Sequence, residues 1–235
     1  MKKIQILLLA AILVTGLRVA YIFYARHEER SQFSKKAAPP PLKDDDYVTP
    51  RKLYPYDLKS AKQLTQQAVW VKVGYSITYF PYDKASHHVN FAHAAGLLLP
   101  IERLNIEDVI TQVAPTDPGE KQAMAVFSSE GKRYVFSIGV LKDNQYHFSS
   151  DEMLFIQDPH ELYEHWPPEV WSAIDNHQLK PGMNQLQANF AVGMGIPQPG
   201  GDDDNKTVNY PNGANPLSVT YRRGKITEIK PGVAS

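Results

Sequence analysis

The sequence predicts an α+β fold made of an N-terminal transmembrane helix, a mainly-β small barrel-like domain and a C-terminal domain of two helices followed by three strands (ααβββ). Three observations support this prediction. An apolar run follows Lys2 and Lys3, short β-rich segments recur over residues 56–158, and two marked helix starts precede three strand-like segments in residues 159–235.

The first element is the apolar run Ile4–Tyr24. As a helix it would reach about 31 Å, which matches the hydrocarbon core of a bilayer. Arg18 is its one charged residue and would cost about 2.5–3.5 kcal/mol at mid-bilayer, which the apolar side chains outweigh. Because Arg18 and Phe23 stand where a cleavage site needs small residues, we expect residues 1–24 to be an uncleaved anchor, with a cleaved secretory signal as the alternative.

The two lysines before this run favour a cytoplasmic N-terminal end, because basic residues tend to stay on that side of a membrane. In a bacterial cell, residues 25–235 would then lie outside the cytoplasm. The chain would be a single-pass inner-membrane protein that contacts lipid through residues 4–24. Cleavage of the segment would instead give a secreted protein.

The composition narrows the partner classes. The chain contains no cysteine, which excludes disulfides, lipid attachment to a thiol and thiolate metal sites. Its 25 basic and 25 acidic residues balance, so there is no electrostatic reason to expect nucleic acid. Protein, envelope polymer and lipid are the expected partners.

Residues 25–55 are polar and rich in proline, which predicts an extended linker. The acidic run Asp44–Asp46 could hold a cation, but no spaced ligands follow it. A solvated charge run is the preferred interpretation.

Residues 56–158 predict a mainly-β domain, because β-branched and aromatic segments alternate with Gly, Asn and Asp turns. Such spacing is typical of a small barrel or bent sheet, and the region is similar in strand rhythm to a bacterial SH3-like β-barrel. The piece Ile106–Ile110 could begin a helix or a strand. The expected strands are Val69–Val73, Ser76–Phe80, Gln122–Phe127, Arg133–Ile138, Gln145–Phe148 and Met153–Ile156.

Residues 159–235 predict two helices and three strands. Pro167 and Pro168 before Glu169 are typical of a helix start. Asn184 can cap a second helix, and Gly193 can end it. The expected strands are Thr207–Tyr210, Leu217–Tyr221 and Ile226–Ile229.

Four short motifs in Val170–Ile229 carry a family resemblance. They are Leu179…Pro181–Gly182–Met183, Asn184…Gln187, Val192–Gly193…Ile196–Pro197 and Val219–Thr220–Tyr221…Gly224–Lys225–Ile226. In these motifs the region resembles the SmpA/OmlA (BamE-like) family of small bacterial envelope domains. Members of that family act by protein–protein contact as accessory lipoproteins of outer-membrane protein assembly. The resemblance therefore implies an ααβββ fold and a protein partner.

The histidines are the candidates for metal or acid–base chemistry. His87, His88 and His93 lie close together, whereas His160 and His165 are five residues apart and do not share a helical face as a zinc-binding helix requires. No serine occupies a Gly-x-Ser-x-Gly elbow. We expect no catalytic residue, metal or cofactor. The alternative is a membrane-tethered hydrolase of envelope polymer with a histidine-based metal or base site.

Aromatic residues are the candidates for partner binding. Tyr75, Tyr79 and Tyr82 recur along one β-rich segment, and Trp166 lies at the junction of the two domains. They would contact a peptide or glycan in an exposed groove, and core packing is the other interpretation. An edge strand and the two-helix face of the C-terminal domain are further candidates.

Together these features predict a non-catalytic, membrane-anchored periplasmic module for protein interaction or envelope assembly. Its partner would be a protein or cell-wall polymer and not nucleic acid.

Overall fold

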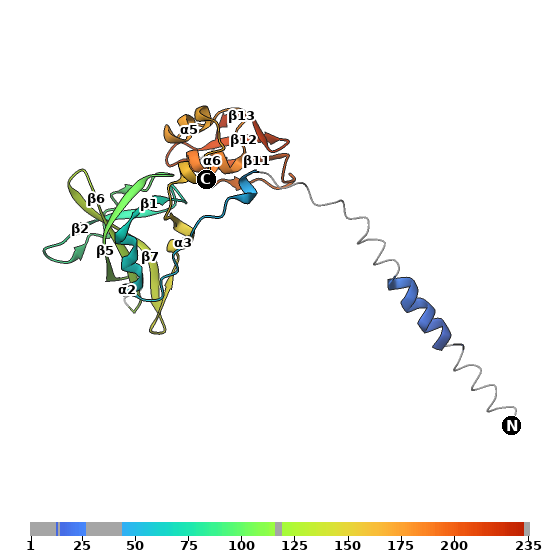
Figure 1. Ribbon diagram of the computed structural model, residues 1–235, viewed down its shortest axis with the longest axis horizontal. Coiled ribbons are helices and arrows are strands. Elements are labelled where there is room, and N and C mark those ends of the chain that lie inside the picture. The colour runs from blue at the N-terminus through green and yellow to red at the C-terminus, as the bar shows by residue number, and fades with distance from the viewer. Residues whose placement is uncertain (1–12, 14, 27–43, 116–118, 233–235) are drawn as a thin grey trace, which may run out of the picture. The chain divides into compact units, whose positions relative to one another are not determined.

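The computed structural model describes residues 13, 15–26, 44–115 and 119–232. Its contacts group the chain into two compact units, Met1–Lys43 and Asp44–Ser235. Figure 1 labels the main elements of the second unit, and each unit is considered by itself.

In the first unit, residues 15–26 are helical. Within the described residues, no helix is both long and apolar enough to cross a membrane. The predicted fold class, with its transmembrane helix over residues 1–24, is therefore wrong: the described chain is a mixed α+β protein with more strand than helix. Residues 1–12 and 14 of the predicted helix lie outside the described residues.

The larger sheet of the second unit contains nine strands in the described residues, in the order β3-β2-β7-β6-β5-β1-β9, with β4 paired to β2 and β8 to β7. All of these pairs are antiparallel. The strands are β1 (Ala68–Val71), β2 (Thr78–Asp83), β3 (His88–Val89), β4 (Gly96–Leu97), β5 (Arg103–Val113), β6 (Lys121–Ser129), β7 (Lys132–Lys142), β8 (Gln145–Phe148) and β9 (Leu154–Phe155).

Strand β6 lies at the centre of this sheet and is covered on both faces. Its residues 123–127 are all buried, a pattern typical of strands with two covered faces. The odd-numbered side chains pack with Leu64 of the short helix η2 (Lys62–Gln66), which follows α2 (Leu58–Ala61). Met124 and Val126 point to the other face and pack with Val89 of β3. The segment after β2 therefore closes a second, smaller core.

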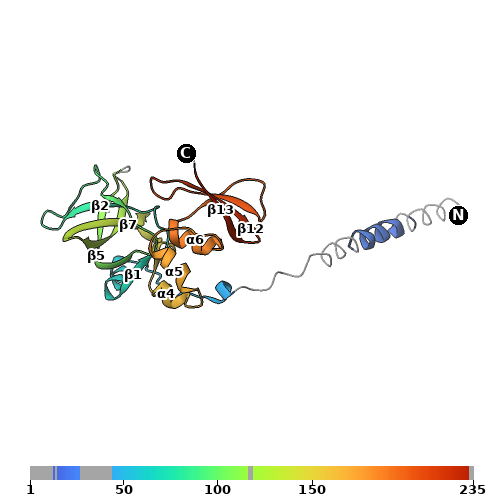
Figure 2. The same cartoon turned by 90° about the horizontal axis from the view of Figure 1, so that it is seen from above.

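The remaining elements form a helical layer and a four-stranded antiparallel sheet in the order β10-β11-β12-β13. Helices α5 and α6 share one core with this sheet, including Phe190, Tyr210 and Tyr221, and Figure 2 shows α6 close to β12 and β13. The elements are α3 (Ser150–Met153), α4 (Pro159–Leu162), α5 (Pro168–Asp175), α6 (Gln185–Val192), β10 (Ile196–Pro197), β11 (Lys206–Tyr210), β12 (Leu217–Arg222) and β13 (Lys225–Pro231).

Helix α6 has well-defined ends. At its start, the side chains of Asn184 and Gln187 each accept a hydrogen bond from the other residue's backbone N–H, which forms a capping box. At its end, Gly193 has φ 81° and ψ −176°, a conformation that essentially only glycine adopts. A Cβ atom there would lie 2.6 Å from the carbonyl oxygen of Gly74. The glycine therefore also allows the loop after β1 to approach the helix.

Two segments from other parts of the unit contact the helical layer. Strand β9 pairs with β1, yet its Phe155 ring contacts the ring of Phe190 on α6 at a centroid distance of 5.6 Å. At the start of the unit, η1 (Asp44–Tyr47) brings Asp45 to the helical layer, and Val48 packs against the same core. Residues of the segment predicted as a linker therefore make specific contacts.

Candidate functional site

A cluster of aromatic rings lies between α4, α5 and α6. Trp166 is at its centre, with ring centroids 4.5 Å from Tyr163, 5.2 Å from Trp171 and 5.3 Å from Phe190. All four residues are buried. Trp166 lies on the short connection between α4 and α5, so the starts and ends of these helices determine its position.

The polar edge of Trp166 faces Asp45. Oδ1 of Asp45 accepts hydrogen bonds from Trp166 Nε1 at 2.6 Å and from His165 Nε2 at 2.7 Å. Oδ2 accepts from Asn184 Nδ2 at 2.8 Å. The Asp45 side chain is only 16% exposed. Three donors therefore converge on a mostly buried carboxylate, an arrangement with strong, charge-assisted hydrogen bonds.

Asp45 remains ionised in this environment. Burial raises the pKa of a carboxyl group, because the charged form loses hydration. At Asp45 the hydrogen bonds from His165, Trp166 and Asn184 outweigh burial and hold the pKa below its ordinary value of 3.8. Asp45 is therefore a negatively charged acceptor that fixes η1 to the helical layer.

His160 of α4 stacks on Trp171 with ring centroids 4.1 Å apart. Its Nδ1 lies 2.9 Å from Asp158 Oδ1, and its Nε2 lies 3.0 Å from Asp175 Oδ1. Burial lowers the pKa of His160, but the hydrogen bonds to the two carboxylates outweigh it and raise the pKa above 6.5. Each ring nitrogen therefore lies within hydrogen-bond distance of a carboxylate oxygen, and the protonated ring can donate to both.

The surface beside His160 and Trp171 is hollowed over about 560 Å³. We call this site the tryptophan hollow. Its carboxylates are Glu164 and Asp175, and its lining contains neither Lys nor Arg. Aromatic rings and carboxylates together suit a cationic group. The lining residues are His160, Glu164, Trp166, Pro168, Trp171, Ser172, Asp175 and Asn176.

The histidines do not form a metal-binding group in the described part of the chain. No group of three or more His, Asp or Glu side chains there is placed to hold a metal ion. Ser172 lines the tryptophan hollow with His160, but both ring nitrogens of His160 contact carboxylates, and neither nitrogen pairs with the serine hydroxyl group. His87 lies elsewhere, 3.3 Å from the hydroxyl group of Tyr82.

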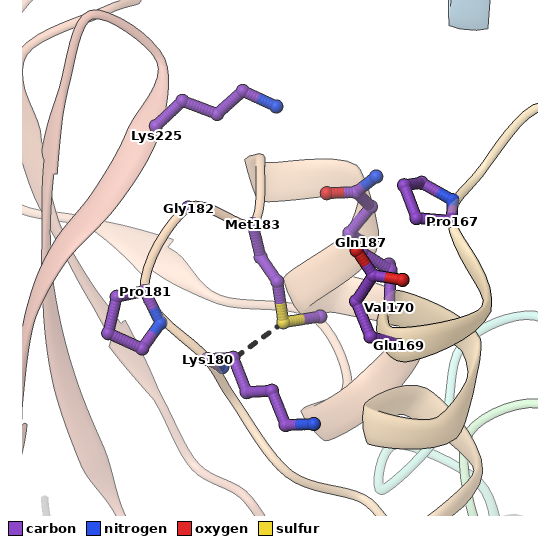
Figure 3. Close-up of a pocket in the computed structure, with 9 residues that line it drawn as sticks. All are labelled: Pro167, Glu169, Val170, Lys180, Pro181, Gly182, Met183, Gln187 and Lys225. Carbon is purple, nitrogen blue, oxygen red and sulfur yellow. Dashed lines mark hydrogen bonds between the residues drawn. The ribbon is translucent and has the colours of Figure 1, made fainter.

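A second pocket, of about 300 Å³, opens between α5, the turn before α6 and the β12–β13 hairpin (Figure 3). We call it the lysine pocket. It shares no lining residue with the tryptophan hollow. Its lining residues are Pro167, Glu169, Val170, Lys180, Pro181, Gly182, Met183, Gln187 and Lys225.

The three tyrosines predicted to bind a partner lie in separate environments. Tyr75 follows β1 with φ 59°, and its ring meets His177 edge-on at 6.4 Å. Tyr79 packs against Tyr134 at 5.1 Å in the larger β core. Tyr82 packs against the smaller core and lines an open hollow of about 560 Å³. Of the four predicted residues, only Trp166 belongs to the aromatic cluster described above.

The edge-strand prediction concerns β13, which ends the smaller sheet in the described residues. The strand carries Lys225, Glu228 and Lys230 and ends in Pro231. Charged side chains and proline on an edge oppose pairing with another strand. The helical layer is therefore the better candidate surface.

Comparison of the chain with protein-family models, curated proteins and solved structures finds no match. The resemblances to BamE-like domains and to SH3-like barrels remain predictions.

Sequence reasoning did not identify two residues of these sites. Asp45 stands in an acidic run that was interpreted as solvated, and its partners lie about 120 positions away. Gln187 belongs to a capping box, and an Asn184-x-x-Gln187 pattern is a recognisable signal for the start of a helix. That signal gives the acceptor role of Gln187 but not its place in a pocket.

Proposed function

We propose that Asp44–Ser235 is a non-catalytic protein-interaction module that binds a basic side chain of a protein partner in the tryptophan hollow. The composition of this hollow is the observation that carries the proposal. Trp166 and Trp171 supply an aromatic wall, and Glu164 and Asp175 supply carboxylates. A Lys or Arg side chain there can donate charge-assisted hydrogen bonds to the carboxylates beside this aromatic wall.

The non-catalytic part of the proposal rests on the contacts of His160. Both of its ring nitrogens lie within hydrogen-bond distance of a carboxylate, that of Asp158 or that of Asp175. Asp175 is therefore engaged with His160, which leaves Glu164 as the other carboxylate of the hollow to meet a partner.

Location in the cell envelope is part of the proposal. A basic start followed by an apolar run, as in residues 2–24, is typical of export, and the resemblance of Val170–Ile229 to BamE-like domains implies protein contact in that compartment. A protein partner is preferred over a cell-wall polymer because Lys and Arg side chains supply the cation. Cell fractionation tests the location: recovery of the full-length chain only from the cytosol would contradict it.

Peptide titration tests the binding mode. The full-length protein is titrated with a short Arg-containing peptide and with the same peptide carrying Gln in place of Arg, while the indole N–H signal of Trp171 is followed by NMR. We expect a saturable shift with the Arg peptide only. Glu164→Gln should weaken binding about tenfold by removing a charge-assisted contact. Glu161→Gln removes the same charge three residues earlier, outside the hollow, and should leave binding unchanged. Equal binding by both variants would refute the proposal.

A further inference from the structure

The lysine pocket combines an apolar floor with two cations. Met183 forms the floor at 2% exposure, and its sulfur accepts a hydrogen bond from the backbone N–H of Lys180 at 3.1 Å. Figure 3 shows Lys180 and Lys225 on opposite sides of Met183. Both lysines are exposed, and neither forms an ion pair with another described residue. Their charges are therefore available to a ligand.

Gln187 adds a hydrogen-bond donor of fixed orientation. The residue is 5% exposed, and its Oε1 accepts the backbone N–H of Asn184 at 2.9 Å. Because a backbone N–H can only donate, the oxygen must face it and the amide nitrogen must point away. Figure 3 shows that nitrogen on the side of Pro167 in the pocket.

The amide nitrogen of Gln187 has no hydrogen-bond partner among the described residues. It is not one of the buried, unpaired side-chain atoms of the described residues, so it reaches the open space of the pocket, where a ligand atom can accept its hydrogen bond. A hydrogen-bond donor in a pocket that also carries two lysines favours an anionic ligand atom.

The charge of the lining selects the kind of anion. Glu169 is the one acidic residue in the lining, so two lysines and one glutamate leave a net charge of +1. A monoanionic carboxylate balances this net charge, whereas a dianionic phosphate would leave one excess negative charge in the pocket. The apolar floor also suits the methylene carbons that precede a side-chain carboxylate.

We infer that the lysine pocket binds the carboxylate of an acidic peptide segment. Gln187 Nε2 donates a hydrogen bond to one carboxylate oxygen, and the ammonium groups of Lys180 and Lys225 supply the counter-charge. The site is independent of the tryptophan hollow, which has different lining residues and the opposite charge preference.

NMR titration of the full-length protein tests this site through the side-chain amide signals of Gln187. The probes are a blocked Gly-Asp-Gly peptide, the matching Gly-Asn-Gly peptide and inorganic phosphate. We expect a saturable shift of the Gln187 signals with the Asp peptide and none with the Asn peptide. Equal shifts with both peptides, or phosphate binding as tightly as the Asp peptide, would overturn the carboxylate assignment.

Two variants separate binding from folding. Gln187→Glu keeps an oxygen for the Asn184 N–H, since Glu serves the same capping role, but replaces the donor with a negative atom. It should melt near the wild-type temperature and weaken Asp-peptide binding at least about tenfold. Its binding is followed through the backbone amide signal of Met183.

The double variant Lys180→Ala with Lys225→Ala should weaken binding similarly. The control double variant Lys121→Ala with Lys142→Ala removes the same charge from β6 and β7 and should leave binding unchanged. Wild-type affinity for the Asp peptide in Gln187→Glu, or in the Lys180 and Lys225 double variant, would overturn the inference. This outcome does not depend on whether the tryptophan hollow binds the Arg peptide.

Discussion

The indole nitrogen of Trp166 donates a 2.6 Å hydrogen bond to the carboxylate of Asp45, 121 positions earlier in the chain. This contact joins the first ordered turn of the second unit to the centre of the aromatic cluster. Because Trp166 also lines the tryptophan hollow, this contact helps to fix one wall of the hollow.

Asp45→Ala should destabilise the protein. The substitution leaves the buried donors of Trp166 and Asn184 without an acceptor, at a cost of about 2–4 kcal/mol in the free energy of unfolding. Urea denaturation followed by tryptophan fluorescence measures the change. Asp44→Ala, at an exposed neighbouring position, should change stability by less than about 0.5 kcal/mol. Equal effects of the two substitutions would show that the buried contacts contribute nothing.

Acid should weaken the same contact. The pKa of Asp45 is lowered in the folded state, so its contribution to stability is complete above the ordinary value of 3.8 and is lost as pH falls through the lowered pKa. Asp45→Asn abolishes this contribution. The stability difference between wild type and Asp45→Asn, measured by urea denaturation, should therefore shrink as pH falls below about 4. A difference that stays constant down to acid unfolding would contradict this expectation.

His160 should produce the opposite pH dependence. Its pKa is raised above 6.5 in the folded state, so the folded protein holds the proton more tightly than the unfolded chain does. The stabilising contribution is complete below pH 6.5 and is lost as pH rises through the raised pKa. His160→Gln should flatten the stability profile in that window, and NMR titration of the His160 ring should give the raised pKa directly. His93→Gln, at an exposed histidine, is the matched control and should leave the profile unchanged.

Tyr210 and Tyr221 should show strong energetic coupling. Their hydroxyl groups are 2.7 Å apart in the core of the smaller sheet, and burial raises the pKa of both, that of Tyr221 to about 12. Tyr221→Phe leaves the Tyr210 hydroxyl buried without a partner in the described residues and should cost about 1–3 kcal/mol. The double variant Tyr210→Phe with Tyr221→Phe should cost less than the sum of the two single changes, because no polar group remains unpaired. If thermal denaturation shows that the double variant loses as much stability as the two single variants added together, the two hydroxyl groups are not energetically coupled.

Gly193→Ala should destabilise more than Gly200→Ala. Both glycines have positive φ, 81° and 93°, and alanine at either position carries about 1–3 kcal/mol of backbone strain. Only at Gly193 would the new Cβ also lie 2.6 Å from the carbonyl oxygen of Gly74, whereas Gly200 has open space around it. Melting temperatures of the two variants check this difference. Similar values would mean that the loop after β1 can move away without cost.

Signals that act over a few residues predicted the local structure well in the C-terminal part. Pro168 begins α5, Asn184 caps α6 and Gly193 ends it, each as expected from its own chemistry. Strand β5 was ambiguous because its pairing with β6 shifts between Ile106 and Asp108. This irregularity breaks the alternation of apolar and polar residues by which a strand is recognised.

Long-range contacts account for what the sequence pattern missed. Asp45 was assigned to a linker, because the three donors that surround it come from positions far along the chain. The aromatic periodicity of Tyr79 and Tyr82 gave no information on which core each ring would join, and their spacing of three puts them on opposite faces of β2. The transmembrane prediction rested on the length of the apolar run Ile4–Tyr24, much of which lies outside the described residues.

Strand β9 belongs to one sheet through its backbone and to the neighbouring core through its side chain. A fragment that ends before β9 would keep β1 but lose the strand that covers its edge, and a fragment that begins after β9 would lack the Phe155 ring that packs against Phe190. The two halves of Asp44–Ser235 therefore share a structural element. Any shortened version of the protein intended for binding studies should keep everything from Asp44 onward, and transplanting the last two helices and their sheet onto another scaffold would require a substitute for Phe155.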